Sequence, residues 1–143
     1  MAALINRRNL RVEWGQCDPA GIVFYPQFFV MFDTSTGLLF ARTGLSPSEM
    51  RKKYGILGMP LVDTGARFLL PCRFDEEIVI ESSVETWGRT SFTVRHHLSK
   101  GGELAVDGFE KRVWASPDPE RPGRIKAQPI PPEIVAALSA PAG

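Results

Sequence analysis

The chain has 143 residues, of which 43% are hydrophobic and 23% charged, an ordinary balance for one globular domain with its own core. Its 17 Lys and Arg residues against 16 Asp and Glu residues leave a net charge of +1, which does not favour partners bound through bulk charge, such as nucleic acid or an anionic membrane. No segment has the roughly 18 consecutive apolar residues of a membrane helix, and the N-terminus lacks the apolar stretch of a signal peptide. We therefore expect a single domain over residues 1–143, located in the cytoplasm, with no nucleic-acid or membrane partner.

The first predicted element is a strand over residues 9–14, because three apolar residues alternate there with charged ones. A turn-rich segment follows. Pro26 then suits the first position of a helix, and apolar residues at three- and four-residue spacing extend this helix to residue 42. Because the helix is apolar nearly all round, we expect the protein to bury it.

A second, shorter helix is predicted to run to about Tyr54, since Ser46 is a typical N-cap and Pro47 suits the first helical position. The rest of the chain is mostly strand-like. The expected strands cover residues 61–73, broken or bulged near Gly65 and Pro71, then 78–87, 90–99 and 103–114, the last bulged at Gly108. The proline-rich residues 116–132 are expected to be mostly a loop, and 132–138 to form a short helix. One buried helix against one antiparallel sheet is an α+β fold.

Neither the cysteines nor the histidines form a pattern typical of a metal site. Cys17 and Cys72 are the only cysteines, too few for a disulfide framework, and we expect both to be reduced. His96 and His97 are neighbours in an expected strand, so their side chains point to opposite faces. We therefore predict no metal and assign both histidines structural roles.

The stretch from Gly15 to Pro26 carries the clearest chemical signal. Asp18 lies in a segment that Pro19 and Gly21 bend, just before the start of the long helix. A helix start offers unpaired backbone amides and the positive end of the helix dipole. Such amides can hold a developing oxyanion while a carboxylate attacks an acyl group or activates water. The alternative is that Asp18 only forms a turn by accepting hydrogen bonds from nearby amides.

The run Cys17-Asp18-Pro19-Ala20-Gly21-Ile22-Val23, followed by two aromatic residues and Pro26, resembles the signature of the 4-hydroxybenzoyl-CoA thioesterase family. This resemblance covers about residues 12–114 and implies the hotdog fold, a sheet wrapped around a long central helix. It also implies a CoA thioester as substrate, with no cofactor. In that family an acid at the position of Asp18 acts as nucleophile or as general base, and the backbone amide at Tyr25 would point at the thioester carbonyl.

Several further residues are candidates for substrate binding. Gly21 and Ile22 would let the acyl group approach the backbone closely. Asp33 lies about two turns into the expected helix, where a buried unpaired charge is costly. We expect it to face a pocket, where it could bond a hydroxyl of the acyl group, or a partner subunit, or to sit on a polar strip. The resemblance implies that the second subunit contributes three residues, Asp63, Thr64 and Gly65, although Asp63 also suits an exposed polar position and Thr64 a routine strand position.

The phosphates of CoA require local cations. The family has neighbouring basic residues in the turn after Trp87, and here Arg89 holds the matching position, with Thr90 and Ser91 as neutral donors. Because Gly88 and Thr90 replace the basic neighbours, the phosphate contact is either weaker at this turn or shifted to other cations. Those other candidates are Arg67, Arg73, Lys100 and Lys126.

A single sheet around one helix leaves an open edge and an uncovered face, which a second subunit can close. We therefore expect at least a homodimer, and the resemblance implies a dimer of dimers with the active site at the dimer interface. The predicted activity is hydrolysis of a small, aromatic acyl-CoA; four phenylalanines near the helix start suit an aryl group, or equally a plain core. The open alternatives are aliphatic acyl-CoA or acyl-carrier-protein thioesters as substrates, and a non-catalytic acyl-CoA-binding module.

Overall fold

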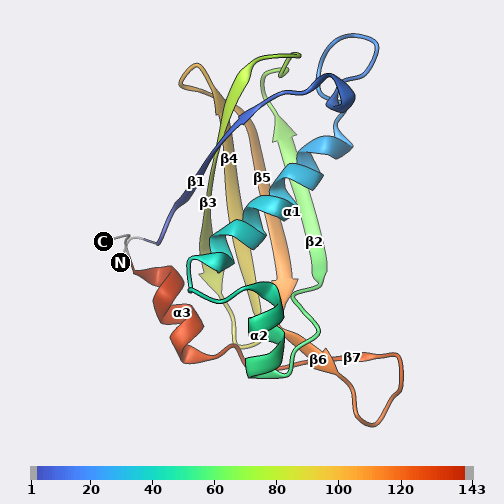
Figure 1. The fold of residues 1–143 in the computed structure, drawn as a ribbon, viewed down its shortest axis with the longest axis vertical. Coiled ribbons are helices and arrows are strands. Elements are labelled where there is room, and N and C mark those ends of the chain that lie inside the picture. The colour runs from blue at the N-terminus through green and yellow to red at the C-terminus, as the bar shows by residue number, and fades with distance from the viewer. Residues whose placement is uncertain (1–2, 141–143) are drawn as a thin grey trace.

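The computed structural model describes residues 3–140, which form a five-stranded antiparallel sheet that curves around one long helix (Figure 1). The strand order is β1-β3-β4-β5-β2, so β1 and β2 are the edges. The bounds of these strands are β1 (Asn6–Arg11), β2 (Leu61–Phe68), β3 (Glu77–Trp87), β4 (Ser91–Lys100) and β5 (Glu103–Val113). The predicted α+β arrangement is confirmed, including the antiparallel meander from β3 to β5.

The long helix α1 (Pro26–Ala41) crosses the concave side of the sheet and begins at the predicted proline. One of its faces is buried against the sheet and consists of Phe28, Met31, Phe32, Ser35, Thr36, Leu39 and Phe40. The expectation that the protein buries α1 all round is wrong for the single chain, because Val30 and Leu38 on the opposite face are exposed. One sheet covers only one side of a helix, so the outer apolar face remains open.

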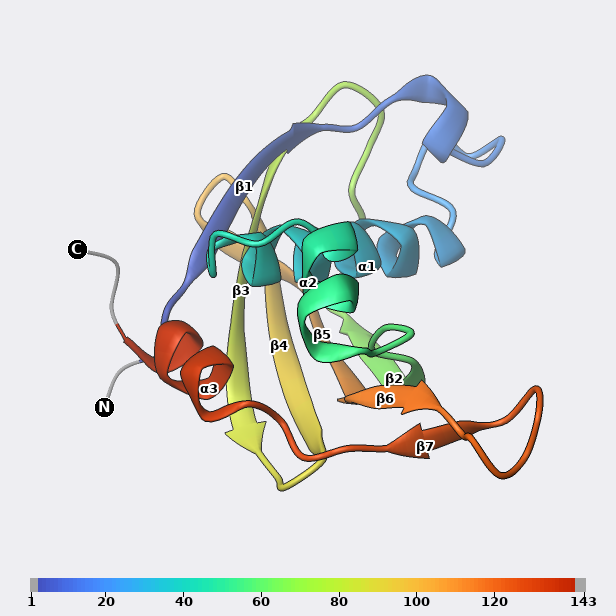
Figure 2. The ribbon, with the colours of Figure 1, turned by 60° about the horizontal axis from the view of Figure 1, so that its bottom comes forward.

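Two shorter helices lie at the end of the fold where α1 ends. The helix α2 (Pro47–Tyr54) is capped as predicted, since the Ser46 hydroxyl accepts from the Glu49 amide and the Glu49 carboxylate accepts from the Ser46 amide, both at 3.1 Å. The helix α3 (Pro132–Ser139) lies beside the chain leading into β1 (Figure 2). Residues 116–132 are mostly loop, as predicted, and the two short strands β6 (Ala115–Pro117) and β7 (Ile125–Ala127) form a projecting hairpin there.

Two strand boundaries differ from the predictions. The first strand ends at Arg11, and a 3-10 turn, η1 (Trp14–Gln16), replaces its expected end because the Gln16 side chain accepts from the Glu13 amide at 2.8 Å. The strand predicted over 61–73 ends at Phe68 and is not broken at Gly65; its irregularity lies between Leu61 and Asp63. The chain leaves the sheet before Pro71 because two successive amides, of Leu69 and Leu70, donate to the same Ala105 carbonyl.

Gly108 does not mark the predicted bulge. The irregularity between β4 and β5 lies between Leu98 and Ser99. At Gly108 an added Cβ would collide with the ring of Phe32 on α1. The absence of a side chain there lets α1 approach the sheet closely.

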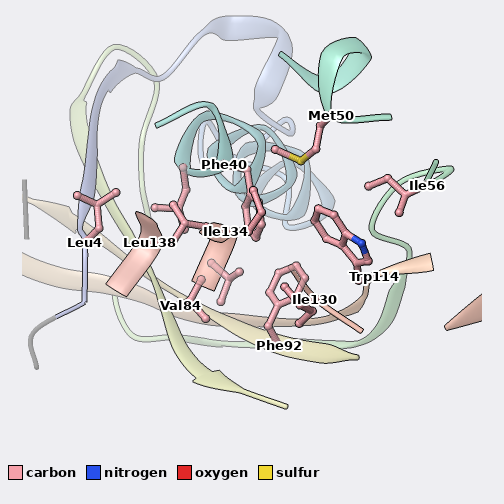
Figure 3. Close-up of a cluster of buried hydrophobic side chains, with 12 residues drawn as sticks. Leu4, Phe40, Met50, Ile56, Val84, Phe92, Trp114, Ile130, Ile134 and Leu138 are labelled. Atoms are coloured by element: carbon pink, nitrogen blue, oxygen red, sulfur yellow. The ribbon is translucent and has the colours of Figure 1, made fainter. Parts of the chain in front are cut away.

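Buried apolar side chains form two clusters along α1, separated by a polar belt. The cluster around its C-terminal half includes Phe40, Phe92 and Trp114 (Figure 3). The cluster around its N-terminal half includes Phe28 and Phe32. The belt between them consists of Thr36, Ser82, His96 and Glu110, all buried. No helix within residues 3–140 is long and apolar enough to cross a lipid bilayer.

Candidate functional site

The loop between η1 and α1 holds Asp18 in a tight turn. The Asp18 carbonyl accepts from the Gly21 amide at 2.9 Å, and Asp18 Oδ1 accepts from the Ala20 amide at 2.8 Å. Gly21 has a φ of 77°, a conformation that glycine adopts without strain. The turn-forming role that the sequence allowed for Asp18 is therefore present. Within residues 3–140, the second carboxylate oxygen accepts no hydrogen bond and can face a bound molecule.

The helix α1 begins without a side-chain cap. Tyr25 is its N-cap residue, and Pro26 at the first helical position has no amide to donate. The Gln27 amide donates to the Phe24 carbonyl at 2.9 Å, and the next amide, of Phe28, donates to the Tyr25 carbonyl. Within the described part of the chain, the Tyr25 amide has no acceptor, so it is the donor that this helix start leaves open.

An apolar pocket of about 260 Å³ opens beside the start of α1. Its wall comes from the loop that carries Asp18, from the first turn of α1 and from the segment that follows β2; it includes Ile22, Val23, Tyr25, Phe28, Phe68 and Leu70. Backbone hydrogen bonds tie these parts together, from the Val23 amide to the Cys72 carbonyl at 2.8 Å and from the Phe74 amide to the Gly21 carbonyl at 3.1 Å. The predicted residues Ile22 and Tyr25 thus line the pocket, whereas Asp18 and Gly21 lie in the adjoining turn, where the Asp18 amide donates to the Ile22 carbonyl at 3.0 Å.

Cys72 also lines this pocket, and burial raises the pKa of its thiol to about 11. Lys100 nearby lowers that pKa, but by less than burial raises it. Because the thiolate is the nucleophilic form, a protonated Cys72 does not serve as the nucleophile near neutral pH. The chemistry at this pocket therefore depends on other groups.

Asp33 lies on the outer face of α1 and does not line the pocket. Its side chain is 70% exposed in the single chain, and its Oδ1 accepts from Arg112 Nη2 at 2.6 Å. Asp33 is therefore neither buried nor unpaired within the chain. The carboxylate is accessible to a partner subunit or to a bound molecule.

Asp63, Thr64 and Gly65 lie on the edge strand β2, outside the pocket wall. Asp63 and Thr64 are exposed, and the Thr64 hydroxyl donates to the Phe109 carbonyl at 2.8 Å. A Cβ added at Gly65 would lie 2.9 Å from the Phe109 ring. The Phe109 ring therefore explains why a glycine occupies this position, where the sequence suggested a break or a bulge.

Arg89, Thr90 and Ser91 lie at the turn between β3 and β4, at the opposite end of the sheet from the start of α1 (Figure 1). The backbone of this turn is used structurally, since the Arg89 carbonyl accepts from the Ile130 amide at 2.9 Å and the Thr90 carbonyl from the Trp114 amide at 2.8 Å. The Arg89 side chain is exposed. Within one chain, the structure does not bring this turn together with Asp18.

Sequence reasoning missed the buried network to which Glu110 belongs. Glu110, only 3% exposed, accepts from the Thr36 hydroxyl and from Arg112 Nη2 at 2.7 Å, and lies 3.1 Å from His96 Nε2. His96 Nδ1 lies 2.7 Å from the Ser82 hydroxyl, which agrees with the predicted structural role. Burial raises the pKa of Glu110, but hydrogen bonds from these three neighbours outweigh it and lower the pKa to about 2. The available signal was the alternation along β5, which places Glu110 and Arg112 on its inward face.

Comparison with known proteins gives consistent matches over nearly the whole chain. The sequence model of the thioesterase-like superfamily matches residues 12–138. A 4-hydroxybenzoyl-CoA thioesterase from Pseudomonas sp. strain CBS-3 is 34% identical over 135 residues, which cover 90% of this chain and 94% of that protein. A putative acyl-CoA thioesterase from Bacillus subtilis is 22% identical over 82% of this chain and 85% of its own length.

Solved structures agree with these sequence matches. An aspartate-to-asparagine mutant of 4-hydroxybenzoyl-CoA thioesterase, complexed with 4-hydroxybenzoyl-CoA, superposes with a TM-score of 0.88 at 31% identity and covers 96% of this chain and 100% of that one. A gentisyl-CoA thioesterase superposes with a TM-score of 0.79 at 30% identity, over 94% of this chain and all of that one. These superpositions confirm the predicted hotdog fold.

Proposed function

Because this chain belongs to the thioesterase-like superfamily, within its 4-hydroxybenzoyl-CoA thioesterase family, and is a thioester hydrolase, we propose that it cleaves a small aromatic acyl-CoA to free acid and CoA. The acyl groups named for two of the relatives described above, 4-hydroxybenzoyl and gentisyl, are hydroxylated benzoyl groups. The apolar lining of the pocket beside α1 supports an aromatic acyl group.

One observation carries this proposal: the loop that holds Asp18 leads directly into the start of α1, where the Tyr25 amide is open and the apolar pocket lies. In the nucleophilic route, an Asp18 oxygen attacks the thioester carbonyl, CoA leaves as its thiolate, and water hydrolyses the mixed anhydride. In the general-base route, Asp18 takes a proton from the water that attacks the same carbon. Both routes place negative charge on the carbonyl oxygen, where the Tyr25 amide and the helix dipole stabilise it.

We further propose that the complete site includes a second copy of the chain. Asp33 and the segment Asp63–Gly65 lie outside the pocket of their own chain, on surfaces that a partner can reach. In this arrangement the Asp33 carboxylate accepts a hydrogen bond from a hydroxyl of the acyl group. The turn of Arg89, Thr90 and Ser91 reaches the CoA phosphates from another subunit, since it lies far along the sheet from Asp18 in one chain. The dimers pair into a dimer of dimers.

The proposed reaction proceeds without a cofactor, because a carboxylate, a backbone amide and water supply all its chemistry. We place the enzyme in the cytoplasm, which the free thiols of Cys17 and Cys72 support.

The activity is tested by measuring thiol release from benzoyl-CoA, 4-hydroxybenzoyl-CoA, phenylacetyl-CoA and aliphatic acyl-CoAs. The native chain and the Asp18→Asn variant are compared on each substrate. The asparagine can still accept from the Ala20 amide, so the turn is kept while the charge is removed. We expect Asp18→Asn to lower turnover of the aromatic substrates at least about a hundredfold.

The chain offers a matched control in Asp118→Asn. Asp118 is also followed by proline, and its Oδ1 accepts from the Glu120 amide at 2.9 Å in the same kind of turn. This variant should keep native turnover. If Asp18→Asn hydrolysed the thioesters at the native rate, Asp18 would be only a turn residue. If aliphatic acyl-CoAs were hydrolysed fastest, the proposed aromatic substrate class would be wrong.

A further inference from the structure

Arg112 connects the buried network beneath α1 to the outer face of that helix. Its Nη2 donates to Glu110 Oε2 at 2.7 Å and to Asp33 Oδ1 at 2.6 Å. Its Nη1 donates to the Met59 carbonyl at 2.9 Å. The Arg112 side chain is 11% exposed, whereas that of Asp33 is 70% exposed. One guanidinium therefore spans from a buried carboxylate to an open one.

The buried carboxylate alone accounts for the presence of the arginine. Glu110 is enclosed by protein and requires a cation, which Arg112 supplies. Asp33 then adds a second negative charge to a guanidinium that is already paired. An ion pair with so exposed a carboxylate adds little to stability. The acid at Asp33 is thus better explained by what it meets outside the chain than by what it contributes to the fold.

The support behind Arg112 fixes its direction. Glu110 accepts from the Thr36 hydroxyl and lies against His96, whose ring is stacked on Phe32 with centroids 4.7 Å apart. A planar guanidinium held by this carboxylate and by a backbone carbonyl has little freedom to turn. The Nη2 donor is therefore presented to Asp33 in one orientation. Among residues 3–140, Asp33 Oδ2 accepts no hydrogen bond.

We propose that Arg112 is a positioning residue that holds the Asp33 carboxylate in place for a hydroxyl of the acyl group and thereby selects hydroxylated aromatic substrates. This inference rests on the function proposed above. Asp33 makes the contact, and Arg112 acts through it, with one Asp33 oxygen bonded to the guanidinium and the other left for the substrate. If Arg112 no longer fixes the Asp33 carboxylate, the preference for hydroxylated over unhydroxylated thioesters should fall more than the turnover of either substrate.

The test compares kcat/KM for 4-hydroxybenzoyl-CoA with that for benzoyl-CoA in native chain, Arg112→Lys and Asp33→Asn. Lysine keeps a cation beside Glu110, so the core charge stays paired, but a single ammonium lacks the planar fork that fixes Asp33. The ratio of the two values should fall about tenfold in Arg112→Lys, the size of a lost hydrogen bond to a charged group. A variant that carries both Arg112→Lys and Asp33→Asn should have the same ratio as Asp33→Asn alone, because the two substitutions disrupt the same interaction.

Arg95→Lys is the matched control. Arg95 lies on the neighbouring strand β4 and also pairs with two carboxylates, those of Glu85 at 3.1 Å and Asp107 at 3.3 Å. Arg95→Lys should leave the ratio of the two kcat/KM values unchanged. The thermal unfolding of each variant shows separately whether its fold is intact. An unchanged ratio in Asp33→Asn would by itself overturn the inference, whether or not Arg112→Lys folds, because Arg112 would then have nothing to position.

Three outcomes are distinguishable. A fall in the ratio confined to Arg112→Lys and Asp33→Asn supports the inference. Equal losses on both substrates in Arg112→Lys, or a native chain that does not prefer the hydroxylated thioester, would overturn it and leave the thioesterase activity standing. No hydrolysis of either thioester by the native chain would instead overturn the proposed substrate class, and the inference with it.

Discussion

Glu110 illustrates how a single buried carboxylate ties stability to pH. Its pKa is lowered to about 2, against a usual value of 4.5, so the ionised form is the one that the fold stabilises. A depressed pKa contributes stability above the usual value, and that stability is lost as pH falls towards the folded-state pKa. We therefore expect the free energy of unfolding to decrease between about pH 5 and pH 2, by at least about 1 kcal/mol from this group.

Urea unfolding of native chain and Glu110→Gln across this pH range measures that contribution. The glutamine variant should be less stable at pH 7, by about 1 to 3 kcal/mol, because Arg112 loses a charged acceptor. It should also lose less stability on acidification than the native chain. Glu103→Gln, an exposed position on the same strand, provides the control. Parallel pH curves for native chain and Glu110→Gln would contradict this account.

At the scale of elements, the docking of α1 depends on one glycine of β5. A Cβ at Gly108 would collide with the Phe32 ring, so Gly108→Ala forces the helix or the ring to shift. We expect a loss of about 1 to 3 kcal/mol in the free energy of unfolding, the usual range for overpacking. At Gly15 a Cβ would meet nothing within 4 Å, so Gly15→Ala should change stability far less in the same urea titration. Equal losses of stability in Gly108→Ala and Gly15→Ala would show that the close contact between Gly108 and Phe32 is not important for the stability of the fold.

The same glycine shows which features the sequence allowed us to predict. Local signals were read correctly: Pro26 starts α1, and Ser46 with Glu49 caps α2. Gly108 was read as a bulge because its reason, the Phe32 ring, lies on an element distant in the chain. A residue whose role depends on a remote partner cannot be interpreted from its neighbours alone.

The candidate site follows the same division. The part formed by one continuous segment, from Asp18 to Tyr25, could be placed from sequence because the turn and the helix start are local. Arg112 was not a candidate, since its contact with Asp33 exists only when α1 packs on β5, the strand that carries both Glu110 and Arg112. Arg89 was a candidate, but its place at the far end of the sheet depends on topology.

At the scale of the whole molecule, the exposed apolar surfaces point to assembly. The edge strand β2 presents an unpaired side, and its Val62 is 57% exposed. The outer face of α1 adds Val30 and Leu38. An open edge next to apolar side chains is the kind of surface that a second copy covers. We expect at least a dimer at micromolar concentration by size-exclusion chromatography with light scattering.

A charge placed at this edge should separate the subunits. Val62→Lys puts an ammonium where two copies of β2 would meet, and burying it unpaired is costly. We expect the dissociation constant to rise at least about tenfold, the effect of losing an interface residue that contributes more than about 1 kcal/mol. Because the proposed site draws on two subunits, thioester hydrolysis should fall in proportion to the dimer that remains. Leu104→Lys, at an exposed apolar position near the start of β5, should preserve both assembly and activity. A Val62→Lys monomer with native turnover would show that each chain carries a complete site.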